Sequence, residues 1–258
     1  VLVWWRRLCQ AAGSLVLPIV ICSKMCWDMI LQTMTPYSGA TAAEHPGYIE
    51  DLSRKTTGIG KFYMGREISF VMGHRAADWL NRPSRIEEEM PDAVVDNMNL
   101  AADDVVADIG AGSGYFTFKM AETAEKVIAL DIDPKALEYI ENQIAIAGDW
   151  ANNIETRLTP AEKPNLEVNE ADAVLIVNTY FYIPERQSYL RQLANCIKEN
   201  GKLVIVEYKI GDMIVGPSDE FKVTPEAIEA ELRKAGFKSV NVDLQSLQYQ
   251  FVITAEKR

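Results

Sequence analysis

Residues 105–116 have the sequence Val-Val-Ala-Asp-Ile-Gly-Ala-Gly-Ser-Gly-Tyr-Phe. A short apolar run rich in valine that ends at a glycine turn is typical of a buried parallel strand. Gly110, Gly112 and Gly114 let a ligand approach the backbone closely, where a Cβ atom would obstruct it. The helical pattern that starts at Tyr115 offers free backbone N–H groups to such a ligand. The stretch therefore predicts a strand, a ligand-binding turn and the start of a helix.

A second acidic position stands where the next strand is expected to end. Residues 127–130 are apolar and lead into Asp131, which lies 21 positions after Gly110 (131 − 110). A carboxylate there can accept hydrogen bonds from both hydroxyls of a ribose, and Ile132 can cover a purine ring. The alternative is that Asp131 is an ordinary loop acid or a helix N-cap, although Asp133 suits the cap better. In this order and at this spacing, the two motifs favour a ligand that contains a ribose and a purine.

The glycine spacing also bears on the class of ligand. Tyr115 stands where the dinucleotide-binding pattern G-x-G-x-x-G has its third glycine. This disfavours a pyrophosphate ligand, and with it a nicotinamide-dependent oxidoreductase. Asp108, directly before Ile109 and the first glycine, favours a ligand with an amino group or other donors.

The remainder of the chain after residue 100 alternates between two kinds of pattern. Strands separated by helical segments predict βαβ units and a mainly parallel sheet. The last two strands are close enough in sequence to pair antiparallel. Strands are expected at 104–109, 126–130, 154–158, 173–177, 202–208, 239–243 and 248–255, and helices at 115–124, 134–148, 185–199 and 224–235.

The chain before residue 100 differs from this body. Residues 1–43 carry two arginines, Arg6 and Arg7, before an apolar run at 11–22 that is too short to span a bilayer. This predicts either an export or lipoprotein signal or a disordered head. Residues 44–62 are polar and are expected to be a linker, and a helical pattern from Tyr63 to about Asn99 predicts a lid segment with a break at Pro83. The predicted organisation is a head at 1–43, a linker and helical lid segment at 44–99, and a ligand-binding domain at 100–258.

Composition excludes several classes of protein. The 258 residues include 26 Lys and Arg and 37 Asp and Glu, a formal net charge of -11. Residues 1–43 hold three basic residues and one acidic residue, so the remaining chain carries -13. A chain this acidic is a poor candidate for binding nucleic acid, which requires a basic face. Four cysteines and two histidines show no zinc-ligand spacing, so no metal site is expected.

Several of these motifs together resemble a known family. Val106–Phe116 followed by Val127–Pro134 resembles the class I S-adenosylmethionine-dependent methyltransferases, and the similarity continues through Ala171–Tyr182 and Ile197–Tyr208. Within the last stretch, Asn200 replaces the glycine that usually comes first in the family's turn. The resemblance covers roughly residues 90–258. Residues 58–68 resemble an uncharacterised bacterial subgroup whose members often carry an export or lipoprotein signal.

The resemblance implies a Rossmann-like three-layer sandwich. Its seven-stranded sheet would be mainly parallel with an antiparallel last strand, and the cofactor, S-adenosyl-L-methionine, would lie across the carboxyl ends of the first two strands. Asp108 would orient the glycine loop or meet the ammonium of the cofactor through water, and Asp131 would hold the ribose. The remaining implied cofactor contacts are Gly110, Ala111, Gly112, Gly114, Ile132, Thr159 and Asn178.

The sequence indicates the residues that would contact the methyl acceptor less specifically than those that would bind the cofactor. Methyl transfer from a sulfonium is an in-line displacement, so alignment comes first, and a general base is needed only if the acceptor loses a proton early. Tyr180 is the catalytic candidate, because its ring can line the methyl path and its hydroxyl can position a donor. The alternative is that Tyr180 packs the edge of the sheet. Glu207 and His74 are weaker candidates for a base, and Tyr63 and Arg66 for a lid over the cofactor.

The predicted function is methyl transfer to a small or medium organic acceptor, neutral or cationic in view of the acidic body. The alternatives are a non-catalytic cofactor-binding protein and, less favoured, the oxidoreductase. No nucleic-acid partner is expected, and membrane association is expected only through residues 1–30. If those residues are a signal, the chain is exported or anchored; otherwise it is cytoplasmic.

Overall fold

The computed structural model of the chain describes residues 48–54, 58–63, 66–69, 80–211, 213 and 215–257. The expected head at 1–43, including its signal, and His74 lie outside the described residues. No helix within the described ranges is long and apolar enough to cross a membrane.

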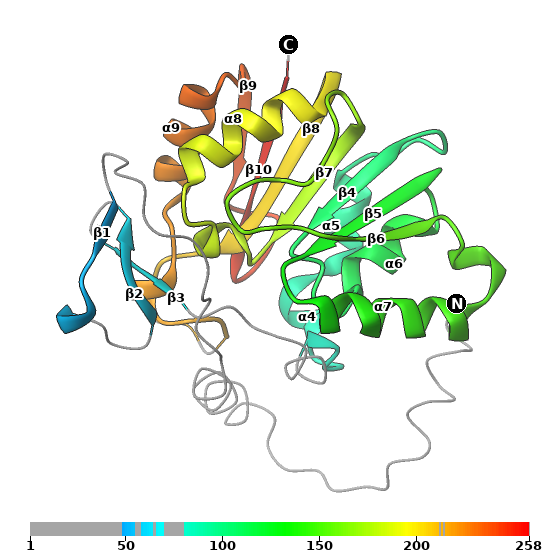
Figure 1. Cartoon of the computed structure of the whole chain (residues 1–258), viewed down its shortest axis with the longest axis horizontal. Coiled ribbons are helices and arrows are strands. Elements are labelled where there is room, and N and C mark those ends of the chain that lie inside the picture. The colour runs from blue at the N-terminus through cyan, green and yellow to red at the C-terminus, as the bar shows by residue number, and fades with distance from the viewer. Residues whose placement is uncertain are drawn as a thin grey trace, which may run out of the picture.

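A seven-stranded sheet forms the centre of the domain (Figure 1), and its strand order is β6-β5-β4-β7-β8-β10-β9. The five strands from β4 to β8 are parallel to one another, and β10 is antiparallel to both of its neighbours, β8 and β9. The expectation of a mainly parallel sheet with an antiparallel last strand is therefore confirmed. The strands are β4 Val105–Ile109, β5 Lys126–Asp131, β6 Ile154–Leu158, β7 Ala171–Val177, β8 Ile197–Tyr208, β9 Ser239–Asp243 and β10 Gln250–Glu256.

Helices cover both faces of this sheet, as Figure 1 shows. Successive strand residues alternate between the faces, so Val106 packs in one core and Ala107 in the other. The first core lies under α5 (Pro91–Asn97), α6 (Tyr115–Ala121) and α7 (Pro134–Ala147), and the second under α8 (Arg186–Cys196) and α9 (Pro225–Ala235). This is the expected three-layer sandwich, and the continuous apolar runs of the strands follow from burial on both faces.

Local signals account for where these helices begin. Asp133 caps α7 by accepting a hydrogen bond from the Lys135 N–H at 3.0 Å, which confirms it in the cap role. Thr224 caps α9 in the same way through the Ala227 N–H, and Gly236 ends that helix with a left-handed φ of 108°.

The segment before residue 70 differs from its prediction. The structure has three antiparallel strands there, β1 (Tyr48–Glu50), β2 (Gly58–Tyr63) and β3 (Arg66–Ser69). The expected linker at 44–62 and the expected helix over 63–69 are wrong for these residues. A few apolar residues at helical spacing were not enough to form a helix here, because the backbone pairs with neighbouring strands instead. Tyr63 of β2 lies opposite Tyr48 of β1 and Arg66 of β3. Within this small sheet, β3 lies beside two short helices of the main domain, η5 (Tyr180–Tyr182) and η6 (Asp219–Phe221).

The helical prediction holds further along. The helical pattern expected after the break at Pro83 forms two helices, α4 (Arg85–Glu89) and α5, separated by Met90 with a left-handed φ of 44°. Pro91 begins α5, where its missing N–H costs nothing. One boundary differs from the expected helix at 185–199 and strand at 202–208, because α8 ends at Cys196 and β8 already begins at Ile197.

Candidate functional site

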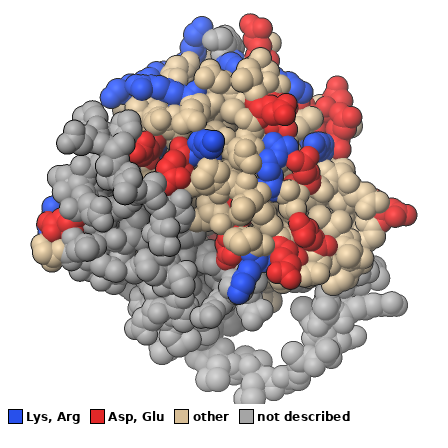
Figure 2. Space-filling view, viewed as in Figure 1, with Lys and Arg blue, Asp and Glu red and all other residues tan. Residues whose placement is uncertain are grey.

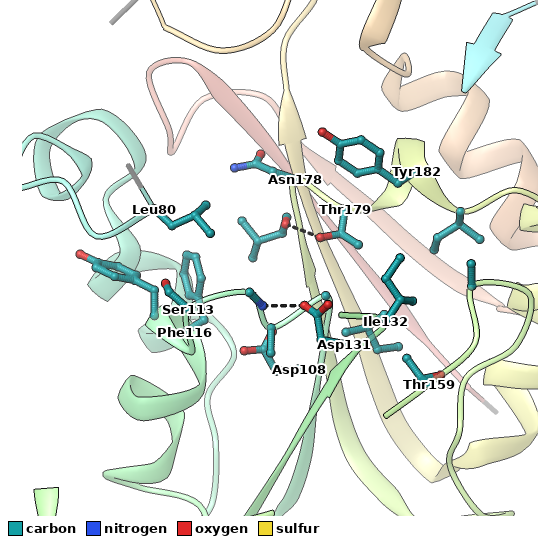
Figure 3. Close-up of a pocket in the computed structure, with 18 of the residues that line it drawn as sticks. Leu80, Asp108, Ser113, Phe116, Asp131, Ile132, Thr159, Asn178, Thr179 and Tyr182 are labelled. Atoms are coloured by element: carbon teal, nitrogen blue, oxygen red, sulfur yellow. Dashed lines mark hydrogen bonds between the residues drawn. The ribbon is translucent and has the colours of Figure 1, made fainter. Parts of the chain in front are cut away.

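A pocket lies at the carboxyl ends of β4, β5 and β7 (Figure 3), where a doubly wound sheet binds its ligands. Most of its wall comes from loops that follow these strands and β6. The lining residues are 108–113, 131–132, 159–161, 177–179 and 182–183, with Leu80, Arg85, Tyr115, Phe116 and Tyr189.

The glycine turn forms the floor of the pocket. Gly110, Gly112 and Gly114 have φ values of 76°, 56° and 78°, which residues with a Cβ rarely adopt. The N–H groups of Gly110 and Ala111 both donate to the Leu130 carbonyl, at 2.8 and 3.0 Å. A Cβ on Gly110 would lie 2.5 Å from the side chain of Thr179. The glycines are therefore required by backbone conformation, and Gly110 also by close packing.

Asp131 faces the pocket from the end of β5 (Figure 3) and supports the turn at the same time. Its Oδ2 accepts a hydrogen bond from the Gly112 N–H at 2.8 Å, and its Oδ1 accepts one from the Asp133 N–H at 2.9 Å. Each carboxylate oxygen has a second lone pair for a ligand. Burial raises the pKa of Asp131, and the backbone hydrogen bonds oppose that shift.

Asp108 is the second buried carboxyl of the pocket, with 3% of its surface exposed. Its Oδ2 accepts a hydrogen bond from the Thr117 hydroxyl at 2.6 Å. Burial raises the pKa of Asp108 to about 6, the Thr117 hydrogen bond lowers it, and the nearby Asp131 raises it further. The charges of Asp108 and Asp131 are thus close enough to influence each other, which suits a ligand that brings positive charge or several donors.

Ile132 and Thr159 line the end of the pocket where the purine was expected (Figure 3). The Thr159 hydroxyl donates to the Lys163 carbonyl at 2.9 Å and accepts from the Asn165 N–H at 3.2 Å. The hydroxyl therefore holds its own loop together, and what Thr159 presents to a ligand at this edge is mainly its backbone and methyl group.

Asn178 follows β7 with a left-handed φ of 51° and lines the pocket, as expected. Its side-chain amide makes two contacts within the protein. Oδ1 accepts a hydrogen bond from Gln250 Nε2 at 2.9 Å, and Nδ2 donates to Glu89 Oε2 at 3.3 Å.

Tyr180 stands apart from the pocket lining, in contrast to the role expected for it. Its side chain is fully buried, and its hydroxyl donates to Glu231 Oε2 on α9. The reason is η5, the short helix after β7, which carries Tyr180 into the core under α8 and α9 while Tyr182 faces the pocket (Figure 3). Tyr180 therefore packs against the sheet, as the alternative to a catalytic role had it, and its hydroxyl cannot reach a ligand in the pocket in this geometry.

Glu207, a weaker candidate for a base, also lies outside the pocket lining. It is buried, and its Oε1 accepts a hydrogen bond from the Tyr180 N–H at 2.8 Å. Burial raises the pKa of Glu207 to about 8. Glu207 does not line the described pocket, so its role is to hold the start of η5.

Arg85 is a pocket residue that the sequence did not indicate. Only 5% of its surface is exposed, and its guanidinium lies 4.4 Å from the ring centroid of Tyr115. Its Nε donates to Glu89 Oε2 at 3.0 Å, and its Nη1 to the Leu80 carbonyl at 2.8 Å. A charged residue in a short helix normally indicates a solvated face, so only the packing of α4 against α6 reveals this cation. Among the described residues, no group of His, Cys, Asp and Glu could hold a metal ion.

Part of the chain is similar to known methyltransferases. Residues 107–205 match the family model of the methyltransferase domain. The demethylmenaquinone methyltransferase of Tropheryma whipplei (strain Twist) is 30% identical over 120 residues, 46% of this chain and 48% of that protein. The tRNA U34 carboxymethyltransferase of Campylobacter fetus subsp. fetus (strain 82-40) is 25% identical over 132 residues, 50% of this chain and 44% of that protein.

A solved structure shares the fold. The crystal structure of a SAM dependent methyltransferase from Aquifex aeolicus superposes with a TM-score of 0.67 at 23% identity, covering 72% of this chain and 98% of that chain. The Rossmann-like fold is therefore confirmed, and residues 107–205 are similar to a methyltransferase domain, as expected. The chain spans about half the length of the curated relatives it matches.

Proposed function

We propose that the whole chain, built around the methyltransferase domain at 107–205, is an S-adenosylmethionine-dependent methyltransferase (EC 2.1.1.-) acting on a small or medium organic acceptor. The observation that carries the proposal is the pair of buried carboxyls, Asp108 and Asp131, beside the glycine turn in one pocket. When bound, the cofactor supplies a methyl group on a positively charged sulfur. The residues of the chain bind and orient it.

The charges of the pocket match the two ends of this cofactor. Asp131 would hold the ribose diol, with Ile132 against the adenine. Asp108 and Arg85 carry opposite charges and lie close enough for Arg85 to lower the pKa of Asp108. We infer that Asp108 faces the ammonium and Arg85 the carboxylate of the methionine end, because a zwitterion pairs best with charges of both signs.

The net charge of the chain supports a proposal for the class of methyl acceptor. The two relatives are named for a quinone precursor and for a tRNA, and this chain carries -13 outside residues 1–43. Figure 2 shows acidic side chains beside basic ones on the described face of the molecule. A phosphate backbone requires a continuous basic surface, so we propose a neutral or cationic small molecule in preference to nucleic acid.

The purified full-length chain is expected to bind S-adenosylhomocysteine in isothermal titration calorimetry and not NADH. Asp131→Ala should weaken this binding by roughly 1–3 kcal/mol, the scale of hydrogen bonds to a charged group. Asp133→Ser is the matched control, because it removes a neighbouring charge but keeps a capping side chain for α7. No heat with millimolar S-adenosylhomocysteine would contradict the proposed function. Unchanged affinity in Asp131→Ala would contradict the ribose assignment alone.

The affinity for S-adenosylhomocysteine is expected to fall as the pH drops below about 6. The pKa of Asp108 is about 6 in the free protein, and only its ionised form attracts the ammonium of the ligand. Below this pKa, binding must first release the proton, so the association constant should fall by up to about tenfold per pH unit. Calorimetry at pH 7.5, 6 and 5 measures this effect.

Two controls assign the effect to Asp108. 5′-Methylthioadenosine has the adenosine part without the ammonium and should bind with little change over the same range. Asp108→Asn should bind S-adenosylhomocysteine weakly and independently of pH. A constant affinity of the unmodified chain between pH 7.5 and 5 would rule out the ammonium contact.

A further inference from the structure

Glu89 is a buried carboxylate at the end of α4, and it contacts four side chains from three parts of the chain. Only 1% of its surface is exposed. Its Oε1 accepts hydrogen bonds from Arg82 Nη2 at 2.9 Å and from the Tyr208 hydroxyl at 3.3 Å. Its Oε2 accepts from Arg85 Nε at 3.0 Å and from Asn178 Nδ2 at 3.3 Å. One oxygen is thus held by Arg82, which precedes α4, and by Tyr208 at the end of β8, and the other contacts two side chains that line the pocket.

The negative charge of Glu89 also sets the direction of a chain of amides. Because a carboxylate only accepts hydrogen bonds, Asn178 must turn its NH₂ group toward Glu89. Its Oδ1 then faces Gln250, which has to donate through Nε2 at 2.9 Å. The Oε1 atom of Gln250 is left buried without a partner among the described residues. Leaving such an acceptor unpaired has an energetic cost, which indicates that the contact with the carboxylate dominates this arrangement.

We propose that Glu89 is a positioning residue for the cofactor site, fixing Arg85 and Asn178 through its Oε2 atom. The inference rests on the proposed function, because it takes Arg85 as the contact for the methionine carboxylate. In the sequence, Arg85 and Asn178 are 93 positions apart (178 − 85), and the shared oxygen holds one relative to the other. Glu89 itself does not line the pocket. Its influence on a ligand therefore passes through these two side chains.

This arrangement predicts an effect on one end of the ligand only. Asp131, Ile132 and Thr159 surround the adenosine end and make none of the four contacts of Glu89. A change at Glu89 should therefore weaken ligands that have an amino acid group and spare those that lack one. A general loss of folding would weaken both kinds equally.

The test measures S-adenosylhomocysteine and 5′-methylthioadenosine binding to full-length Glu89→Gln by calorimetry, with thermal unfolding to check the fold. Glutamine keeps the size but removes the charge, and its NH₂ group competes with those of Arg85 and Asn178. Affinity for S-adenosylhomocysteine should fall at least tenfold, and that for 5′-methylthioadenosine less than twofold. Glu88→Gln is the matched control, since Glu88 pairs with Arg82 at 2.6 Å, whereas Arg85 and Asn178 donate to Glu89. It should leave both affinities unchanged.

If Glu89→Gln does not fold, Glu89→Asp keeps the charge but draws the carboxylate back from Asn178, and the same selective loss is expected. Equal loss for both ligands, or no loss for either, would overturn the positioning role and leave the proposed function standing. Failure of the unmodified chain to bind S-adenosylhomocysteine would overturn the proposed function, and the positioning role with it.

Discussion

Gly110→Ala is expected to destabilise the folded chain by about 2–5 kcal/mol and to abolish measurable binding of S-adenosylhomocysteine. The φ of 76° at this position costs a residue with a Cβ roughly 1–2 kcal/mol. The new methyl group would lie 2.5 Å from both Cγ2 and Oγ1 of Thr179, and such overpacking costs about 1–3 kcal/mol more. Thr179 is held in place because its hydroxyl donates to the Val177 carbonyl at 2.9 Å, so the turn itself must move, and it forms the floor of the pocket.

Urea denaturation and calorimetry measure the two effects. Gly236→Ala is the matched control, because Gly236 is also left-handed, with a φ of 108°, but has no atom within 4 Å of the position of a Cβ. This variant should be destabilised only by the backbone conformation, by about 1–2 kcal/mol, and its affinity should be unchanged. If Gly110→Ala is no more destabilising than Gly236→Ala, the close contact between the turn and Thr179 does not exist.

Arg186→Met is expected to destabilise the chain by about 3–5 kcal/mol while leaving the affinity for S-adenosylhomocysteine nearly unchanged. Arg186 donates through Nε and Nη2 to both oxygens of Glu231, at 2.9 and 3.2 Å. Their side chains are only 7% and 9% exposed. Removing Arg186 leaves the buried carboxylate of Glu231 without its ion-pair partner, although the Tyr180 hydroxyl still donates to it. A buried charge that loses its partner is the case in which breaking an ion pair is most destabilising. Arg186 and Glu231 do not line the described pocket.

Chemical denaturation again gives the free energy of unfolding. Arg233→Met is the control, because the pair of Arg233 with Glu229 is 50% and 35% exposed. Exposed pairs contribute about 0–1 kcal/mol, so its effect should be small. Arg186→Met with Glu231→Leu should recover much of the loss by removing the unpaired charge. A cost below about 1 kcal/mol for Arg186→Met alone would mean that Glu231 is solvated or neutral in the folded chain.

The strands and the glycine turn could be predicted because their signals are local. Burial on both faces makes β4, β5 and β7 continuous apolar runs, and the left-handed φ at Gly110 makes glycine necessary at that position. The place of Asp131 followed from topology, since the ends of adjacent parallel strands meet at one edge of the sheet. The small sheet at 48–69 was missed because a few apolar residues at helical spacing do not show which strand will pair with them.

Taken alone, the amino-acid sequence determined the order of strands and helices after residue 100, the glycine turn and the two aspartates of the pocket. These depend on side-chain periodicity and backbone conformation over a few neighbouring residues. Only the tertiary structure decided that Tyr180 packs against Glu231 and that Arg85 and Glu89 are buried beside Asn178. For a polar side chain, burial depends on a partner that is distant in the sequence. Its role is therefore settled by how the layers pack, and not by its neighbours in the chain.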